Sequence, residues 1–236
     1  MTYIEGQPSW GRGLAGVIIR ALSCIAPDDR VWTITDGRIP CGRGWTHNGT
    51  EFIVLQNVQG QSVTDNGHNP AVQAKSMIER GDRILEKQGS SYRDVVRIWF
   101  YLSNILDWYG DFNNVRSDKY CEFGLMPKAD DDSLLLPAST RVNGDNTMGT
   151  AGTMDLVAVS SRPGSKPFIK QLTNPTQKDA FCYGASFSRG TLIRQQDFSL
   201  IEVSGTAAID KNGMSLYPGD VRSQIVCTLD KIEALI

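Results

Sequence analysis

The stretch FIVLQNVQGQ, residues 52–61, decides the fold class of this chain of 236 residues. Its apolar run from Phe52 to Leu55 is typical of a short buried strand. Gly60 and the cluster Asp65-Asn66-Gly67 predict a turn after that strand. Asn69-Pro70 then matches the N-cap and first position of a helix, because Asn can accept from free backbone N–H groups and Pro lacks one. The stretch therefore begins a strand–turn–helix unit.

The residues that follow extend this unit into a mixed α+β pattern. Gly89 marks the end of the first helix, and a strand is predicted over residues 94–102 (DVVRIWFYL) because β-branched and aromatic residues are dense there. A second helix follows, then a long loop over residues 127–152 interrupted by a short segment at 134–143, and a strand at 154–159 (MDLVAV). This order predicts an α+β fold with the helices on one face of a sheet. The apolar stripe of the first helix is Ala74, Met77, Ile78, Gly81, Ile84 and Leu85, and that of the second is Leu106, Tyr109, Phe112, Val115 or Arg116, Lys119 or Tyr120, and Phe123.

A second copy of the strand–turn–helix unit lies near the end of the sequence. Val58-Gln59-Gly60-Gln61 aligns with Val203-Ser204-Gly205-Thr206, and each follows an apolar strand and precedes a turn containing Asn and Gly. From Gln73 and Gln224 onward the two helices align without a gap. A repeat of this kind predicts a duplicated fold.

The repeat also predicts the division of the chain. We expect an N-terminal extension (1–45), a first unit (46–165) and the start of a second unit (166–236). The second copy reaches only its first helix, whereas the first copy continues through a strand, a helix and a closing strand. By comparison with the first copy, about sixty or more residues of the natural protein are expected beyond Ile236.

Composition excludes several classes of function. The chain has 24 Lys+Arg against 26 Asp+Glu, so no basic surface for nucleic acid or an anionic membrane is expected. The apolar fraction of 40% is adequate for a core. The apolar stretch 14–25 is interrupted by Gly16, Arg20 and Ser23. It is too short to span a bilayer and too far from the N-terminus for a signal peptide.

Cysteine and histidine usage points to a protein of the cytoplasm without a metal. The five cysteines form no C-x-x-C pair, which favours reduced thiols. With only His47 and His68 available, neither a metal site nor a cofactor is expected.

Several spaced motifs together resemble the Rid (reactive intermediate deaminase) superfamily, also called YjgF-like or endoribonuclease L-PSP. The resemblance covers about residues 50–160 completely and 181–236 in part. Tandem copies behind an N-terminal extension further resemble the chorismatases, which hydrolyse chorismate on a duplicated Rid-type scaffold. The motifs are the strand with Val58-Gln59-Gly60-Gln61, residues 98–104, Asp111-Phe112 with Val115, Tyr120 with Phe123, Pro137-Ala138-Ser139-Thr140, and Met154 to Val159.

The resemblance implies a chorismate-mutase-like α+β fold, packing as a homotrimer or pseudo-trimer, and ligand clefts between adjacent units. In the family, an Arg in a Pro-Ala-Arg motif grips the substrate carboxylate, a task suited to a guanidinium. Here Ser139 stands at that position, and Arg141 follows about 7 Å further along the same face of the strand. The family's Ser is replaced by Gln59 and its Glu by Asp155. We therefore expect a non-catalytic first copy that lends Arg141 to a shared cleft.

The second copy keeps more of the family pattern. Ser204-Gly205-Thr206 follows the family motif except for Thr in place of Gln, and Tyr183 stands where the family has Tyr. The resemblance implies Tyr183 and Ser204 as catalytic residues, and Arg141, Gly205 and Thr206 as substrate-binding residues. The Arg and Glu of this copy are expected beyond Ile236.

Three functions stay open at this point, each with a small carboxylated metabolite as the partner. The first is metal-free hydrolysis of an imine or enamine to a carbonyl and ammonia. The second is chorismatase-like hydrolysis that releases pyruvate, and the third is a catalytically inert ligand-binding or scaffold protein. A serine triad is not expected, because no His–Asp pair accompanies Ser204. RNA cleavage is disfavoured by the acidic balance of charge.

Overall fold

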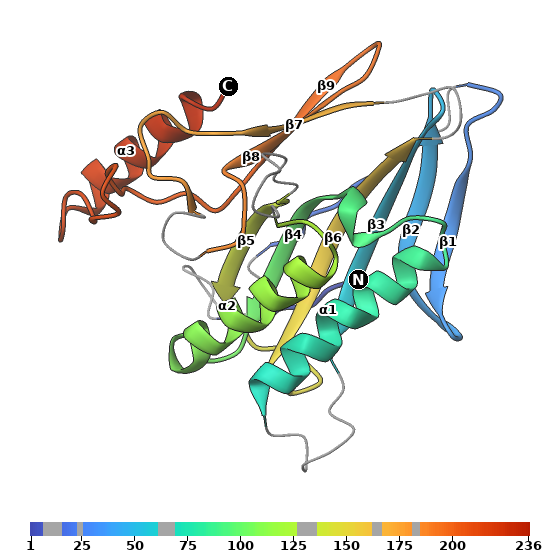
Figure 1. Ribbon diagram of the computed structural model, residues 1–236, viewed down its shortest axis with the longest axis horizontal. Helices are drawn as coiled ribbons and strands as arrows, with labels where there is room; N and C mark the ends of the chain where they lie inside the picture. The colour runs from blue at the N-terminus through green and yellow to red at the C-terminus, as the bar shows by residue number, and fades with distance from the viewer. Residues whose placement is uncertain (7–15, 23–25, 61–68, 127–135, 162–166, 181–184) are drawn as a thin grey trace.

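The computed structural model describes residues 1–6, 16–22, 26–60, 69–126, 136–161, 167–180 and 185–236. These residues form one large sheet with helices on a single face and a smaller sheet beside it (Figure 1). The predicted turn at 65–67 lies outside the described residues. No helix in the described part of the chain is long and apolar enough to cross a membrane.

The large sheet has six strands in the order β1-β2-β3-β6-β4-β5. Neighbouring strands are antiparallel except β4 and β5, which are parallel. Two long helices, α1 (Pro70–Glu86) and α2 (Ile105–Glu122), cover one face of this sheet (Figure 1). The predicted α+β class with helices on one face is confirmed. The strands are β1 (Val31–Asp36), β2 (Ile39–His47), β3 (Thr50–Gln59), β4 (Val95–Leu102, after a 3-10 turn at Tyr92–Asp94), β5 (Ala138–Asn143) and β6 (Gly152–Ser161).

Helix α1 forms where the sequence predicts it and buries its predicted stripe. The Asn69 side chain accepts from the backbone N–H groups of Ala71 and Val72, at 3.0 and 3.3 Å, and so caps the helix. All six stripe residues are buried in the main core. A Cβ at Gly81 would lie 2.7 Å from Met154 Cε, so this glycine lets the helix approach the sheet closely.

Strands β1 and β2 lie in a segment that the sequence assigns to an N-terminal extension. They pair with each other and, through β2, with β3. Two glycines interrupt the apolar alternation of β2, and both are required by close contacts. A Cβ at Gly42 would lie 2.3 Å from the Val54 carbonyl oxygen, and one at Gly44 would lie 2.2 Å from the Trp32 ring. Gly42 and Gly44 thus allow close packing but interrupt the pattern by which β2 could be predicted. The first strand of the sheet begins at Val31.

The small sheet contains β7 (Phe168–Leu172), β8 (Gly190–Arg194) and β9 (Ser199–Val203), all antiparallel. Its β9, together with helix α3 (Val221–Glu233), is the second strand–turn–helix unit predicted by the repeat. Ile193 and Leu200 pack on the face of the large sheet opposite the helices, against side chains such as Phe52 and Val157. The small sheet therefore lies across the open face of the large one.

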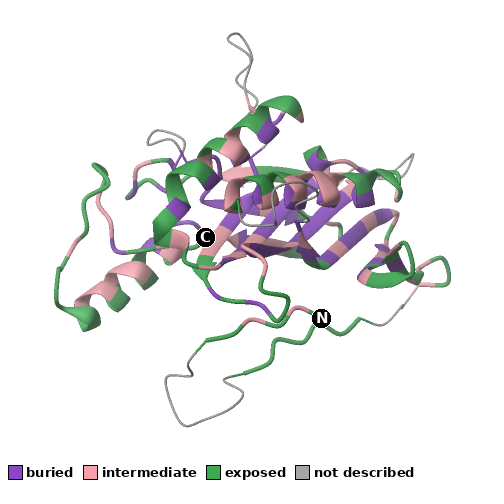
Figure 2. Cartoon of the chain, turned by 90° about the horizontal axis from the view of Figure 1, so that it is seen from below, coloured by how far each residue is buried: buried purple, intermediate pink, exposed green. Residues whose placement is uncertain are grey.

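Helix α3 differs from α1 in which side it buries. Ile225, Leu229 and Ile236 are 56%, 58% and 82% exposed, whereas their repeat counterparts in α1 are buried. The side of α3 turned toward the protein carries Lys231, whose Nζ donates to the Thr176 carbonyl at 3.2 Å. Figure 2 shows the same contrast, with buried residues concentrated in the large sheet and its helices. Polar contacts hold α3, and Ile225 and Leu229 of its apolar stripe are exposed, whereas Leu235, just after the helix, is buried.

Matched truncations in the two helices test this contrast. Ile78→Ala should lower the free energy of unfolding by about 2–5 kcal/mol, because it leaves a cavity under α1. Leu229→Ala, at the equivalent position of α3, should change it by less than about 0.5 kcal/mol. Urea denaturation followed by circular dichroism measures both values. Equal losses would show that α3 packs by its apolar face in solution.

Candidate functional site

The large and small sheets meet along the free edge of β5. Ser188 forms a parallel bridge with Ala138, and its N–H donates to the Pro137 carbonyl at 3.1 Å. On the same edge the Gly205 N–H donates to the Ser139 carbonyl at 3.1 Å. The second unit thus continues the hydrogen bonding of β5 beyond the large sheet. This junction brings the predicted Ser204, Gly205 and Thr206 beside the first unit.

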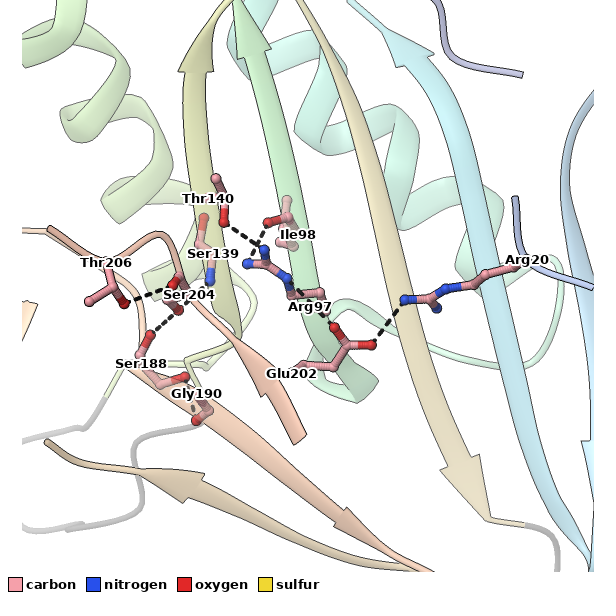
Figure 3. Close-up of polar contacts among 10 residues, drawn as sticks. All are labelled: Arg20, Arg97, Ile98, Ser139, Thr140, Ser188, Gly190, Glu202, Ser204 and Thr206. Carbon is pink, nitrogen blue, oxygen red and sulfur yellow. Dashed lines mark hydrogen bonds and ion pairs between the residues drawn. The ribbon is translucent and has the colours of Figure 1, made fainter. Parts of the chain in front are cut away.

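Ser204 is the central polar side chain of the junction (Figure 3). Its Oγ accepts from the Ser139 N–H at 2.8 Å and donates to the Ser188 carbonyl at 2.5 Å. The residue is only 3% exposed. Thr206 Oγ1 donates to the Ser204 carbonyl at 3.0 Å. A Cβ at Gly205 would lie 3.3 Å from Thr140 Cγ2, so Gly205 allows the two chains to approach closely.

On the open face of the sheet, an arginine of β4 is held by a carboxylate of β9. Arg97 Nη2 donates to Thr140 Oγ1 at 2.6 Å, and its Nε lies 3.8 Å from Glu202 Oε2. The other oxygen of Glu202 accepts from Arg20 at 3.1 Å (Figure 3). Burial lowers the pKa of Arg97 to about 10, and the charge of Glu202 opposes that shift. This group of residues fastens β9 to the large sheet.

On the opposite face, toward α2, Arg141 lies at the boundary between the two units. Successive residues of a strand point to opposite faces, so Arg141 points away from the face that carries Thr140. Its Nη1 donates to Asn113 Oδ1 at 2.8 Å. Its guanidinium carbon lies 4.9 Å from the Tyr109 ring centre and 5.0 Å from that of Phe187. Arg141 therefore contacts both α2 and the second unit.

Beside it lies Arg116 of α2, which is fully buried. Its Nη2 donates to the same Asn113 oxygen at 3.0 Å, while its Nε and Nη1 have no hydrogen-bond partner among the residues that the structure describes. Burial and the nearby charge of Arg141 lower the pKa of Arg116 to about 10. No carboxylate among the described residues forms an ion pair with Arg116. A buried cation without a counter-ion is costly unless something else binds it.

The sequence did not identify Arg116, Asn113 or Phe187 as site residues. A signal for Arg116 was present, because Arg116 and Val115 are alternatives for one position of the apolar stripe in α2. A cation in a core-facing stripe needs either a partner or a ligand. Phe187 gave no comparable signal. Tyr183 lies outside the described residues, and its role stays a prediction.

Asp155 lies apart from these residues, on the open face of β6. Its carboxylate accepts from Thr2 Oγ1 at 2.5 Å and from the Asn57 N–H at 2.8 Å. Burial raises its pKa, although both hydrogen bonds favour the charged form. Gln59, at the family's Ser position, donates to Asn57 Oδ1 at 2.9 Å. In the part of the chain that the structure describes, no group of three or more His, Cys, Asp or Glu could hold a metal ion.

Comparison with known proteins shows which fold the chain has. No protein-family model and no curated protein matches the chain. Among solved structures, a chorismatase matches 86% of this chain with a TM-score of 0.60 and 22% sequence identity. The chain has the fold of that chorismatase. It spans 59% of the chorismatase chain.

Shorter proteins match the chain as well. The YjgF gene product of E. coli and yeast Mmf1 each match with a TM-score of 0.42, at 15% and 14% identity. The match to the YjgF gene product covers 54% of this chain and 91% of that protein. The match to Mmf1 covers 56% of this chain and 100% of that protein. The resemblance to the chorismatases is confirmed as a likeness of fold by the chorismatase match.

Ser204→Ala tests how the junction is held. Removing Oγ leaves the Ser139 N–H and the Ser188 carbonyl without this partner in a buried place, at a cost of about 1–3 kcal/mol. Ser199→Ala, at an exposed position of β9, is the matched control and should cost little. Denaturant titration compares the two variants. Unchanged stability with a large loss of turnover would instead show that Ser204 acts on a substrate.

Asp155→Asn tests the buried carboxyl group. Because the folded state raises the pKa of Asp155, the ionised form is destabilising, so the Asn variant should be the more stable protein at pH 7. The difference should shrink as the pH falls through the folded pKa toward the unfolded value of about 3.9, where both forms are neutral. Denaturation at pH 7 and pH 4 measures it, with exposed Asp118→Asn as the control. A difference that grows on acidification would contradict the assigned direction of the pKa shift.

Proposed function

We propose that the chain binds a small carboxylated metabolite between α2 and the second unit, at Arg116 and Arg141. The observation that carries the proposal is the buried Arg116 guanidinium, whose Nε and Nη1 have no hydrogen-bond partner in the described part of the chain. A carboxylate can accept two parallel hydrogen bonds from a guanidinium, which offsets the cost of burying the charge. Phe187 and Tyr109 supply aromatic surface against the Arg141 guanidinium.

The reaction we propose for the natural protein is hydrolysis of such a metabolite, with chorismate as the first substrate to test. The two-unit likeness to a chorismatase supports this choice over the imine or enamine that the family motifs favoured. No carboxyl group of the described residues pairs with Arg116. The described residues therefore support binding of the substrate carboxylate. They do not identify the acid that would protonate the substrate in the chemical step. The division into an extension, a first unit and the start of a second, and the trimer or pseudo-trimer, also stay proposals.

Arg116→Met tests the binding site. In the absence of ligand the variant should be more stable by at least about 1 kcal/mol, because it removes a buried charge that lacks a counter-ion. Its dissociation constant for chorismate and pyruvate should rise at least about tenfold, since a charged hydrogen-bonding partner is lost. Thermal shift and calorimetry measure both effects, with exposed Arg38→Gln as the control. Lower stability together with unchanged binding would contradict the proposal.

Turnover is measured in two separate assays. Release of pyruvate from chorismate supports the chorismatase-like reaction. Competition with semicarbazide for an amino-acid-derived imine supports deamination instead. Binding without turnover in either assay leaves a ligand-binding protein. A wild-type protein that is not stabilised by any of these carboxylates would contradict the proposed function as a whole.

A further inference from the structure

We propose that the ring of Phe187 is the shared aromatic partner of three arginines, and that this contact holds the second unit against the first and positions Arg116. It makes Phe187 a positioning residue. The positioning of Arg116 rests on the proposed function, because Arg116 is the group proposed to bind the carboxylate. The holding of the second unit does not depend on any ligand.

Three guanidinium groups lie over this one ring. The guanidinium carbons of Arg141, Arg189 and Arg116 lie 5.0, 5.5 and 5.9 Å from its centre. A cation is attracted to the face of an aromatic ring within about 6 Å of the ring centre, and the attraction grows when water is excluded. Phe187 is only 5% exposed, so its ring is shielded from water. The three arginines come from β5, from the second unit and from α2, so the ring joins three parts of the chain.

Apolar packing alone gives little reason for a phenylalanine at this position. Among the described residues, the buried apolar cluster that contains Phe187 has only two other members, Ala180 and Ala185. Phe52, on the open face of the large sheet, lies instead in a cluster of branched side chains such as Val157. Two alanines offer little apolar surface to an aromatic ring. The contacts with arginine therefore distinguish the surroundings of Phe187.

The hydrogen bonds of the three arginines are compatible with the aromatic contact. Arg116 and Arg141 donate to Asn113 Oδ1 at 3.0 and 2.8 Å, and Arg189 donates to the Lys178 carbonyl. A guanidinium is planar and its N–H groups lie in that plane. Hydrogen bonds in the plane do not compete with contact between its face and an aromatic ring. The amide oxygen and the ring can therefore act together on Arg116.

The neighbours of Phe187 fix its ring relative to the first unit. Ser186 Oγ lies 2.7 Å from Ser117 Oγ of α2, and the Ser188 N–H donates to the Pro137 carbonyl at 3.1 Å. These contacts, one on each side of Phe187, place the ring at the arginines. Arg116 thus meets this ring only when the second unit is docked. We expect binding of a carboxylate at Arg116 to depend on the second unit for this reason.

Stepwise fluorination of the ring tests the inference with little change of shape. Phenylalanine analogues with one, two and three ring fluorines withdraw electron density from the ring face and so weaken its attraction for a cation. Placed at position 187, they should lower the melting temperature without ligand further with each added fluorine. The control is the same series at Phe52, which is buried and stacks on Trp45, with no described arginine or lysine over its ring. The series at Phe52 should show no such stepwise fall.

Calorimetry with chorismate and with pyruvate measures the positioning of Arg116. The analogue with three fluorines at position 187 should raise the dissociation constant at least about threefold, because Arg116 is held less firmly. The same course of melting temperature at positions 187 and 52 would overturn the inference, whether or not wild type binds. A stepwise fall with unchanged binding would overturn the positioning of Arg116. If wild type binds neither probe, the proposed function fails, while a stepwise fall at position 187 still supports the role of the ring in holding the second unit.

Discussion

The free edge of β5 is the constraint on which the geometry of the candidate site depends. An edge strand presents unpaired N–H and C=O groups that must be satisfied or shielded. Here the second unit supplies those partners, through the backbone of Ser188 and Gly205 and through the Ser204 hydroxyl. These short hydrogen bonds fix the position of residues 185–189 relative to β5. Phe187 comes to lie over Arg141 as a consequence.

Two buried arginines beside this edge illustrate different uses of the same residue type. Arg97 lies opposite Glu202, so its charge contributes to attaching the small sheet. Among the described residues, Arg116 donates to the neutral Asn113 oxygen and lies against the rings of Phe112 and Phe187, with no carboxylate in an ion pair with it. Replacing a buried ion pair by apolar residues often stabilises a protein, so retention of an uncompensated charge is difficult to explain by stability alone. Its burial cost is consistent with a ligand-binding role.

Local sequence patterns predicted individual helices and strands better than they predicted how these pack together. The stripe of α1, its Asn69 cap and the second strand–turn–helix unit were all visible, because periodicity and capping are properties of neighbouring residues. Strand β2 was missed because Gly42 and Gly44, which permit close packing, interrupt the alternation. Strand β1 (VWTITD) contains no glycine and is rich in β-branched residues, so a signal for it was present. The site was only partly visible. Arg141 could be selected by resemblance, but its contact with Phe187 joins residues far apart in the sequence and depends on the junction.

The unequal burial of α1 and α3 shows what holds the second unit in place. Because Ile225 and Leu229 of α3 are exposed and only Leu235, just after the helix, is buried, this part of the stripe adds little hydrophobic free energy to the attachment. Attachment rests instead on Ile193 and Leu200 against the open face, on the hydrogen bonds along β5, and on Arg97 with Glu202. Of these contacts, the hydrogen bonds along β5 also bring Phe187 beside Arg116. A ligand that touches both units would therefore add its binding free energy to the attachment of the second unit, since anything that binds only the docked state stabilises it.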